Sequence, residues 1–405
     1  MKVLAAIVLA PHWLVAGGPN AALSLTAALS KICDIDLARM ATKDATHDRD
    51  GLKIFDLRAT NPLSFVRRWV PQRVLTLLYR SRIPALIREG DYDLVHIHNP
   101  IPALEMKRVA RACRRKGVPY VVSTHGIVEV SDQGSIFELG GMERLAWRWL
   151  VDAPIRWVFR HASCVMALSP ADLPILEELG CRRERIVVVP NGVDLPASAP
   201  DAGALEAVCR KFALPFPKPA DVPVCMFLAN HTKTKGLSVL LDALSGYEGP
   251  FRLVAAGSQR EYLDYEGFAA RSSAYQSFNF PGFVTDREAG LLLDYADLFV
   301  FPTLSDTFPL VVLEALAHGL PVLSTRVGGI PFQVPESCGI LVEPGDPKAL
   351  IAALRTLTSD PDRLARMGRA AREHAARSFS WDASARSALA AYRALVSEPA
   401  VNPNR

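Results

Sequence analysis

The chain has 405 residues, of which 50% are hydrophobic and 22% are charged, with a formal net charge of +4. This length predicts two domains, and the composition excludes a disordered or collagen-like chain. The net charge is too small to indicate nucleic-acid binding by itself, so electrostatic partners must be inferred from local clusters. The seven cysteines are scattered without a C-x-x-C pair, which favours a reducing compartment and argues against a structural metal.

The amino terminus predicts a buried strand followed by a loop and a helix. An apolar run, 3–10, follows Lys2 as in a signal peptide, but it is short and lacks a clear cleavage site. Two glycines and a helical pattern come next, at the spacing of a strand, a loop and a helix. We therefore expect a first strand here, and no segment reaches the roughly 18 continuous apolar residues of a membrane span.

The glycine pair in "AGGPN" (16–20) is the first candidate binding feature. Adjacent glycines let a phosphate or a sugar approach backbone amides, which makes Gly17 and Gly18 candidate donor-binding residues. The stretch lacks the full G-x-G-x-x-G pattern of dinucleotide-binding loops, and a plain turn explains it equally well.

Two basic stretches that contain aromatic residues, 65–88 and 143–160, suggest contact with an anionic membrane surface. Such segments can lie on an anionic bilayer, where each basic group contributes about 1 kcal/mol. A solvated helix face is the alternative. The first stretch contains no acid, and its basic residues are Arg67, Arg68, Arg73, Arg80, Arg82 and Arg88.

Short runs rich in β-branched residues alternate with helical patterns along the chain. Continuous apolar runs of this kind are typical of parallel strands buried on both faces. Strands separated by helices predict doubly wound α/β layers, in which ligands bind beyond the carboxyl ends of the strands. The runs form two sets: 2–10, 93–98, 119–125, 164–169 and 185–190, and then 224–229, 251–257, 298–303, 321–325 and 339–343.

A segment rich in proline, alanine and aspartate, 193–205, separates the two sets of strands. We expect the domain boundary near Leu195. A ligand shared by two such domains would lie in the cleft between them.

Two histidines, His96 and His98, lie on one side of a predicted strand end. Their spacing suggests a metal site, but two ligands are too few to hold one. We expect them to form hydrogen bonds in the floor of the cleft.

Lys235 and Gly236 open a predicted helix after the first strand of the second set, in "ANHTKTKG" (229–236). The helix dipole disfavours a lysine at this end unless it serves a bound anion. The arrangement favours a phosphate site, and a solvated loop lysine is the alternative.

The stretch "TLSDTFPLVVLEALAHGLPVLSTRVGG" (303–329) places Asp306 in a loop and Glu314 inside the helix that follows. An ideal helix would place these carboxylates about 12 Å and about 80° apart, so they are not a tight pair. Burying Glu314 unpaired among apolar neighbours is costly, which favours a ligand for it over an exposed helix position. The two acids could contact different parts of one extended ligand, whose phosphates would be capped by the free amides of Thr307, Phe308, Pro309 and Leu310.

Here the sequence resembles the retaining glycosyltransferases of the GT-B fold, family four, whose E-x7-E signature 306–314 matches with an aspartate in first place. The resemblance implies two doubly wound Rossmann-like domains facing across a cleft, an acceptor-binding domain at 1–195 and a nucleotide-sugar-binding domain at 196–378. The segment 379–405 resembles the family's last helix, which packs back on the first domain. Other matching stretches are "STHG" (123–126), "VVPNGVD" (188–194), "PGFV" (281–284), "GLPVLSTRVGGIP" (319–331) and "GILVEPGDPKAL" (339–350).

The resemblance implies transfer of a hexose-type sugar from a UDP- or GDP-sugar, with net retention at the anomeric carbon. Lys235 matches the diphosphate-binding lysine, Glu314 the glutamate that takes the ribose hydroxyls, and Asp306 the carboxylate near the donor sugar. His125 matches a histidine beside the transferred sugar, and Gly18 a backbone that contacts the phosphate. We therefore expect His125, Lys235 and Asp306 to be catalytic.

The leaving group in this reaction is a nucleoside diphosphate, whose charge can be stabilised by lysine, amides and helix dipoles. No cofactor or metal is then required, and nothing in the sequence resembles a metal-ligand cluster. In the family the leaving phosphate takes the acceptor proton on the same face, so no side chain is assigned as the nucleophile.

Two positions depart from the family pattern. Asn230 replaces an arginine that would contact the diphosphate, and Lys233 could supply the missing charge. Phe332 replaces a carboxylate after the glycine pair. These changes keep two alternatives open, a catalytically degenerate partner subunit and a nucleotide-sugar epimerase.

The acceptor expected from the resemblance is a saccharide or a lipid-linked saccharide in the biosynthesis of cell-surface polysaccharide or lipopolysaccharide. We expect a cytoplasmic protein that associates peripherally with the inner face of the plasma membrane and does not bind nucleic acid.

Overall fold

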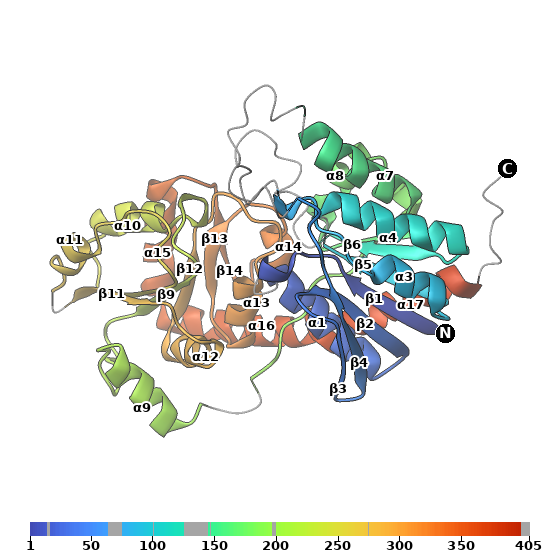
Figure 1. Cartoon of the computed structure of the whole chain (residues 1–405). Helices are drawn as coiled ribbons and strands as arrows, with labels where there is room; N and C mark the ends of the chain where they lie inside the picture. The colour runs from blue at the N-terminus through green and yellow to red at the C-terminus, as the bar shows by residue number, and fades with distance from the viewer. Residues whose placement is uncertain are drawn as a thin grey trace. The chain divides into compact units, whose positions relative to one another are not determined.

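The computed structural model describes residues 1–13, 17–63, 75–99, 101–124, 145, 147–196, 200–273 and 275–397. The chain divides into two compact units (Figure 1): unit 1 comprises Met1–Gly192 and Trp381–Arg405, and unit 2 comprises Val193–Ser380. The boundaries expected from the sequence are near Leu195 and at residue 379. Each unit is built around a largely parallel sheet, which confirms the expected α/β class.

Unit 1 contains an eight-stranded sheet of order β3-β4-β2-β1-β5-β6-β7-β8, parallel except for β3 against β4. The sequence prediction missed β2, β3 and β4. They lie at one end of the sheet, and their charged residues interrupt the apolar runs by which buried strands are recognised. The strands are β1 (Lys2–Ile7), β2 (Asp34–Ala41), β3 (Ala45–Arg49), β4 (Leu52–Arg58), β5 (Leu94–His98), β6 (Tyr120–Ser123), β7 (Cys164–Ala167) and β8 (Ile186–Val188).

Helices cover both faces of this sheet, which is why its central strands are apolar on both sides (Figure 1). Along β1, Val3 and Ala5 pack with α1 and α17, whereas Leu4 and Ala6 pack with α3, α4 and α7. The last helix of the chain therefore belongs to the core of unit 1. The helices are α1 (Gly17–Ser30), α3 (Ile83–Glu89), α4 (Ala103–Lys116), α7 (Ala153–His161), α8 (Leu173–Glu178) and α17 (Trp381–Ser397).

A buried polar network joins α17 to the sheet of unit 1. The hydroxyl of Tyr392 lies 2.5 Å from His96 Nδ1, and His96 Nε2 lies 2.7 Å from Ser123 Oγ. The rings of His96 and His98 are 3.8 Å apart. The histidine pair thus lies in a hydrogen-bonded interior, and no metal-binding group of three His, Cys, Asp or Glu side chains forms among the described residues.

Unit 2 contains a parallel six-stranded sheet of order β11-β10-β9-β12-β13-β14. The sequence prediction missed β11, an edge strand that is only partly buried. The strands are β9 (Val224–Leu228), β10 (Phe251–Ala256), β11 (Gln276–Gly282), β12 (Leu298–Phe301), β13 (Val322–Thr325) and β14 (Gly339–Val342). The helices are α9 (Ala202–Lys211), α10 (Leu237–Ser245), α11 (Tyr265–Ala269), α12 (Asp286–Tyr295), α13 (Leu310–Ala317), α14 (Ile330–Gln333), α15 (Pro347–Thr358) and α16 (Pro361–Ser378).

The strand order of unit 2 reverses between β9 and β12. The chain runs outward from β9 through β10 to β11, and then returns to place β12 on the other side of β9. Such a reversal leaves a crevice at the carboxyl ends of the two strands, where ligands of doubly wound folds bind. Among the described helices of both units, none has the length and apolar character needed to cross a bilayer.

Candidate functional site

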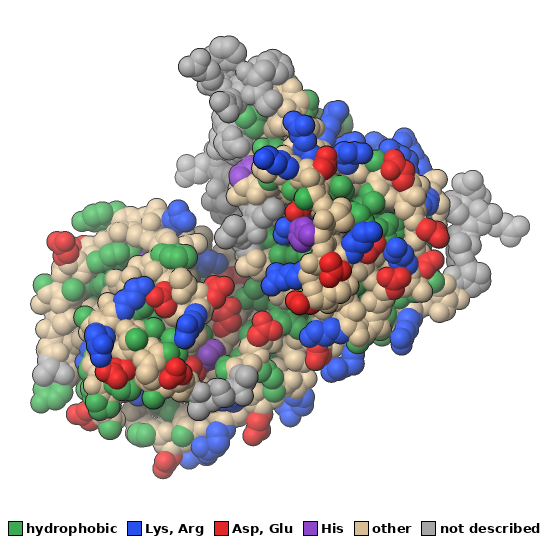
Figure 2. Space-filling model, turned by 60° about the horizontal axis from the view of Figure 1, so that its bottom comes forward, with side chains coloured by type: hydrophobic (Ala, Val, Ile, Leu, Met, Phe, Trp, Pro, Cys, Tyr) green, Lys and Arg blue, Asp and Glu red, His purple; other side chains and the backbone are tan. Residues whose placement is uncertain are grey.

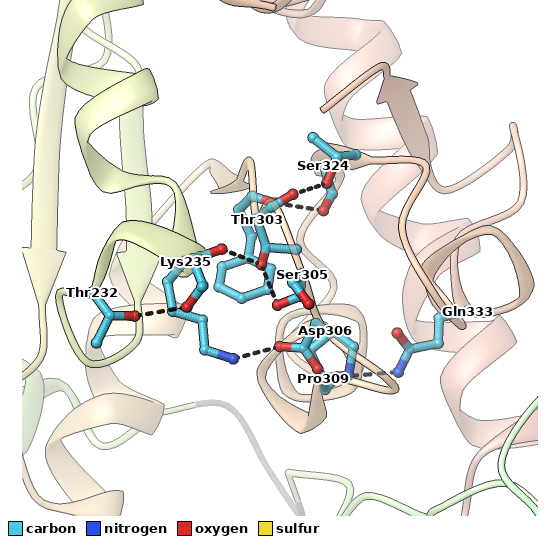
Figure 3. A network of polar contacts seen from close by, with 11 residues as sticks. Thr232, Lys235, Thr303, Ser305, Asp306, Pro309, Ser324 and Gln333 are labelled. Carbon is cyan, nitrogen blue, oxygen red and sulfur yellow. Dashed lines mark hydrogen bonds and ion pairs between the residues drawn. The ribbon is translucent and has the colours of Figure 1, made fainter. Parts of the chain in front are cut away.

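Two predicted catalytic side chains meet at the carboxyl ends of β9 and β12 (Figure 3). Lys235 Nζ lies 2.6 Å from Asp306 Oδ2, with the side chains 28% and 14% exposed. Lys235 follows β9 and Asp306 follows β12, so the contact lies at the strand-order reversal of unit 2. The fold therefore brings a cation and a carboxylate from distant parts of the chain to the edge where a ligand is expected.

The position of Lys235 is set by the close approach of its turn to the end of β12. Lys235 ends the short 3-10 helix η6 (Lys233–Lys235), and Gly236 follows with φ of 77°. A Cβ on Gly236 would lie 1.9 Å from the carbonyl oxygen of Pro302. Only glycine permits this close contact, because any other residue would place a Cβ against the carbonyl. The contact brings the neighbouring Lys235 to the end of β12.

Hydrogen bonds hold the same turn against the strand end. The Thr234 carbonyl accepts from Thr303 Oγ1 at 2.9 Å and from the Leu304 amide at 2.7 Å. These two hydrogen bonds and the close approach of Gly236 to Pro302 hold the backbone of the Lys235 turn against the end of β12.

The loop that carries Asp306 is supported from its other side by the glycine pair before α14. Gly328 has φ of 51°, and a Cβ there would lie 2.1 Å from the Asp306 carbonyl oxygen. The Gly329 amide donates to the Thr307 carbonyl at 2.7 Å. Gln333 is fully buried, and its Nε2 donates to the Pro309 carbonyl at 3.1 Å (Figure 3). These supporting roles were not predicted from the sequence, although the glycine pair itself was visible.

The helix α13 begins at Leu310, and Pro309 is its N-cap with an extended backbone. The prediction that Pro309 contributes an amide was wrong, because proline carries no N–H. The Val312 amide donates to the Pro309 carbonyl at 3.2 Å, and the amides of Leu310 and Val311 form no backbone hydrogen bond within the described part of the chain. The positive end of the helix dipole lies at these amides, an environment that favours negative charge.

Two buried polar atoms near this helix end have no partner in the described part of the chain. They are the hydroxyl oxygen of Thr307, a predicted donor-binding residue, and Oε1 of Gln333. A buried unpaired polar atom costs about 1–3 kcal/mol. Phe308, the other predicted residue of this loop, is buried and packs its ring against Phe379 at 6.1 Å.

Glu314 lies half-buried in α13, and no described residue forms a hydrogen bond or an ion pair with its carboxylate. Burial raises the pKa of Glu314, the nearby Asp286 carboxylate raises it further, and His318 opposes both. The His318 ring contacts Asp294, with Nδ1 2.6 Å from Oδ1 of that carboxylate. Glu314 is therefore a desolvated acid whose carboxylate is not paired with any described residue.

The other predicted donor-binding residues of unit 2 are exposed. Asn230 and Lys233 both face solvent on the loop before Lys235. Between them His231 is buried, with Nδ1 against the Tyr265 hydroxyl and with Nε2 unpaired in the described structure. Burial lowers the pKa of His231, and a backbone hydrogen bond at Ala256 opposes this shift. No motif distinguished this histidine in the sequence.

Two predicted site residues, Gly17 and Gly18, belong to unit 1. Gly17 and Gly18 form the start of α1, where Gly17 is exposed and Gly18 is half-buried. His125 lies outside the described residues.

Two family models together match most of the chain. Glycosyltransferase Family 4 matches residues 16–196, and Glycosyl transferases group 1 matches residues 212–374. The D-inositol 3-phosphate glycosyltransferase of Xylanimonas cellulosilytica is 31% identical over 321 residues, which cover 75% of this chain and 72% of that protein. The chain belongs to the family-four glycosyltransferases. Across four curated relatives, the aligned region covers from 50% to 79% of the relative's own length.

Solved structures of the GT-B fold match almost the whole chain of this glycosyltransferase. Sucrose-phosphate synthase from Thermosynechococcus elongatus has a TM-score of 0.74 at 23% identity, over 98% of this chain and 100% of that one. HepE from Anabaena, solved with UDP-glucose, has a TM-score of 0.66 at 17% identity, over 97% and 100%. The expected GT-B fold is confirmed.

Proposed function

We propose that this glycosyltransferase is a retaining hexosyltransferase. It uses a UDP- or GDP-sugar as donor and a saccharide or lipid-linked saccharide as acceptor, in cell-surface polysaccharide biosynthesis. The observation that carries the proposal is the contact of Lys235 with Asp306 at the strand-order reversal, beside the amino end of α13. The UDP-glucose bound in the HepE structure supports a nucleotide-sugar donor.

The donor diphosphate would bind between Lys235 and the amides of Leu310 and Val311. These groups meet negative charge where it grows as the bond to the sugar breaks, which is how preorganised dipoles accelerate such a step. Lys235 forms an ion pair with Asp306. The ammonium group of Lys235 would therefore contact both the Asp306 carboxylate and the donor diphosphate. Asp306 is then held beside the donor sugar, and Lys233 supplies a second positive charge nearby.

Glu314 would fix the nucleotide by accepting the two ribose hydroxyls. The carboxylate lacks a partner among the described residues, so hydrogen bonds from a ligand would offset its desolvation. The proposed reaction needs no metal and no cofactor, since the leaving phosphate takes the acceptor proton. His125 and the backbone of Gly18 are proposed to meet the transferred sugar and the phosphate.

A donor screen tests this proposal. The pure protein is melted with a series of UDP- and GDP-sugars, and nucleoside diphosphate, free sugar and epimerised donor are then measured. A transferase gives a stabilising donor and release of nucleoside diphosphate in the presence of acceptor, with the anomeric configuration retained. A stabilising donor without turnover identifies a degenerate subunit, which the loss of arginine at Asn230 would explain. An epimerised donor identifies an epimerase, and no stabilisation by any nucleotide rejects the donor site.

We also propose peripheral association with the inner face of the plasma membrane, where a lipid-linked acceptor would be found. Support comes from the basic stretch 143–160, in which Arg156 and Arg160 are exposed on α7. Residues 65–74 of the first stretch, 65–88, lie outside the described residues, and its described arginines, Arg80, Arg82 and Arg88, are exposed.

A further inference from the structure

The outer surface of α4 is strongly basic. Its positive residues recur at helical spacing, so they form one stripe along about 12 Å of helix. The adjacent helix α7 adds two exposed arginines, and Figure 2 shows Lys and Arg side chains gathered along one edge of unit 1. We call these residues the α4–α7 basic face: Lys107, Arg108, Arg111, Arg114 and Arg115 on α4, and Arg156 and Arg160 on α7.

Most of this charge has no local compensation. Arg108 pairs with the buried carboxylate of Glu105, and Arg156 pairs with Asp152. The other five basic side chains have no carboxylate within ion-pair distance in the described part of the chain: Lys107, Arg111, Arg114, Arg115 and Arg160.

Three of these cations crowd around one aromatic ring. Lys107 Nζ, Arg111 Cζ and Arg114 Cζ lie 5.5, 5.3 and 5.7 Å from the centre of the Trp157 ring. Cation–π attraction holds each of them near the ring, but it also holds like charges together. Burial lowers the pKa of Lys107, and Arg111 lowers it further. An external anion would relieve this repulsion.

The shape and the flanking residues favour an extended anionic surface over a small anion. The charges lie on the solvent side of two helices and are spread along α4. At the start of α7, η3 (Arg148–Asp152) carries Trp149, which is 67% exposed, and the nearby Leu145 is 59% exposed. Tryptophan beside arginine and lysine suits the headgroup layer of a bilayer, where the ring meets acyl chains and the cations meet phosphates.

We infer that the α4–α7 basic face, with Trp149 at its edge, docks on the headgroups of an anionic lipid bilayer. This inference rests on the membrane association proposed above and assigns it to α4, a helix outside both stretches that suggested a membrane in the sequence. Lipid binding needs no donor, so a failed transferase assay leaves the inference standing, and a failed lipid assay leaves the transferase standing.

The experiment is co-sedimentation with phosphatidylcholine vesicles, with and without phosphatidylglycerol, at low and high salt. Arg111→Gln, Arg114→Gln and Arg115→Gln are combined in one variant. A matched control combines Arg355→Gln, Arg369→Gln and Arg377→Gln, which are exposed on α15 and α16 of unit 2. Each triple lowers the formal charge by three from +4, to +1.

The parent should sediment with anionic vesicles at low salt and not with neutral ones, and high salt should release it. The α4 triple should bind about a hundredfold more weakly, at about a fivefold loss for each charge, while the control binds like the parent. Trp149→Ser should weaken binding by up to about tenfold and should leave the salt dependence unchanged.

Equal losses in the two triples would show that net charge governs binding and would overturn the inference. The inference would also be overturned if the parent protein did not bind anionic vesicles, or if it bound a soluble polyanion such as DNA but no lipid. Unchanged binding by Trp149→Ser would remove Trp149 from the docking surface. Superimposable urea-unfolding curves for both triples establish that the variants are folded.

Discussion

Lys235 and Lys107 are both half-buried lysines, but their surroundings are opposite. Lys235 lies 2.6 Å from the carboxylate of Asp306 in a turn fixed by glycine and backbone hydrogen bonds. Lys107 shares the Trp157 ring with two arginines, and burial and Arg111 lower its pKa. Lys235 is therefore held in an ion pair, whereas Lys107 and its neighbours Arg111, Arg114 and Arg115 on α4 have no carboxylate within ion-pair distance in the described structure.

This difference matters for what each region can bind. A paired lysine in a rigid loop presents a defined geometry, which suits one phosphate group in a reaction. A row of unpaired cations on a helix surface provides attraction without a fixed geometry, which suits a fluid, repetitive surface. Substitution of Lys235 should therefore impair the reaction, whereas substitution of the α4 cations should impair attraction to a charged surface.

The largest effect is expected from Gly236→Ala. The added methyl group would lie 1.9 Å from the Pro302 carbonyl oxygen at a φ of 77°, so the turn that positions Lys235 must move. We expect a loss of unfolding free energy of roughly 4 kcal/mol, measured by urea denaturation. Gly282→Ala is the matched control, because Gly282 has φ of 73° and nothing lies within 4 Å of the added methyl. It should cost only about 1 kcal/mol. Equal costs would contradict the proposed contact.

Lys235→Ala should act mainly on turnover. The ammonium opposes charge that develops on the leaving diphosphate, so its loss should lower kcat by about 10²- to 10³-fold with a smaller change in KM. Nucleoside diphosphate release measures this effect. Lys211→Ala, which breaks the exposed pair with Glu288 in the same unit, should leave kcat unchanged. If Lys235→Ala raised only KM, Lys235 would bind the ground state and the transition state equally.

Glu314→Gln should weaken nucleotide binding by about 1–3 kcal/mol, because the amide keeps the shape and loses half of the acceptor character. Calorimetric titration with the stabilising nucleotide measures the change. Asp294→Asn is a suitable control, since it changes the carboxylate that holds His318 and leaves Glu314 in place. An unaltered nucleotide affinity in Glu314→Gln would make Glu314 a structural helix residue.

Glu314 should also make the free protein less stable as pH rises. Its pKa is raised in the folded state, so the folded chain binds this proton more tightly than the unfolded chain does. The resulting stabilisation is fully present below the unfolded pKa and is lost as pH rises through the folded value. The difference in unfolding free energy between Glu314→Gln and the parent should therefore shift in favour of the variant between acidic and neutral pH. A difference independent of pH would show that Glu314 titrates normally.

The smallest effect is expected from Lys107→Met on stability. Removing one of several crowded cations relieves repulsion while the side chain still packs on Trp157, so the unfolding free energy should stay within about 0.5 kcal/mol of the parent or rise. Lys235→Met, in contrast, leaves Asp306 partly buried without its partner and should lower stability. Urea denaturation of both variants at one pH makes the comparison. A loss in Lys107→Met equal to that in Lys235→Met would refute the contrast.

The amino-acid sequence by itself determined the parallel α/β class, because strands such as β9 and β12 are continuous apolar runs that only a sheet covered on both faces can bury. It also singled out Lys235, Asp306 and Glu314, since local spacing places them at strand ends and in a helix. It missed β2, β3 and β4, whose charged residues interrupt such runs, and β11, which is only partly buried.

Only the tertiary structure decided which of these residues meet. The contact of Lys235 with Asp306 joins positions 71 residues apart, and it depends on how closely the backbone at Gly236 approaches Pro302. The support from Gln333 and the burial of His231 likewise depend on loops that converge at one edge of a sheet. The sequence also did not reveal that α4 cations crowd around Trp157 of α7. Periodicity indicates which face of a helix is polar, but it does not indicate which helix lies beside that face.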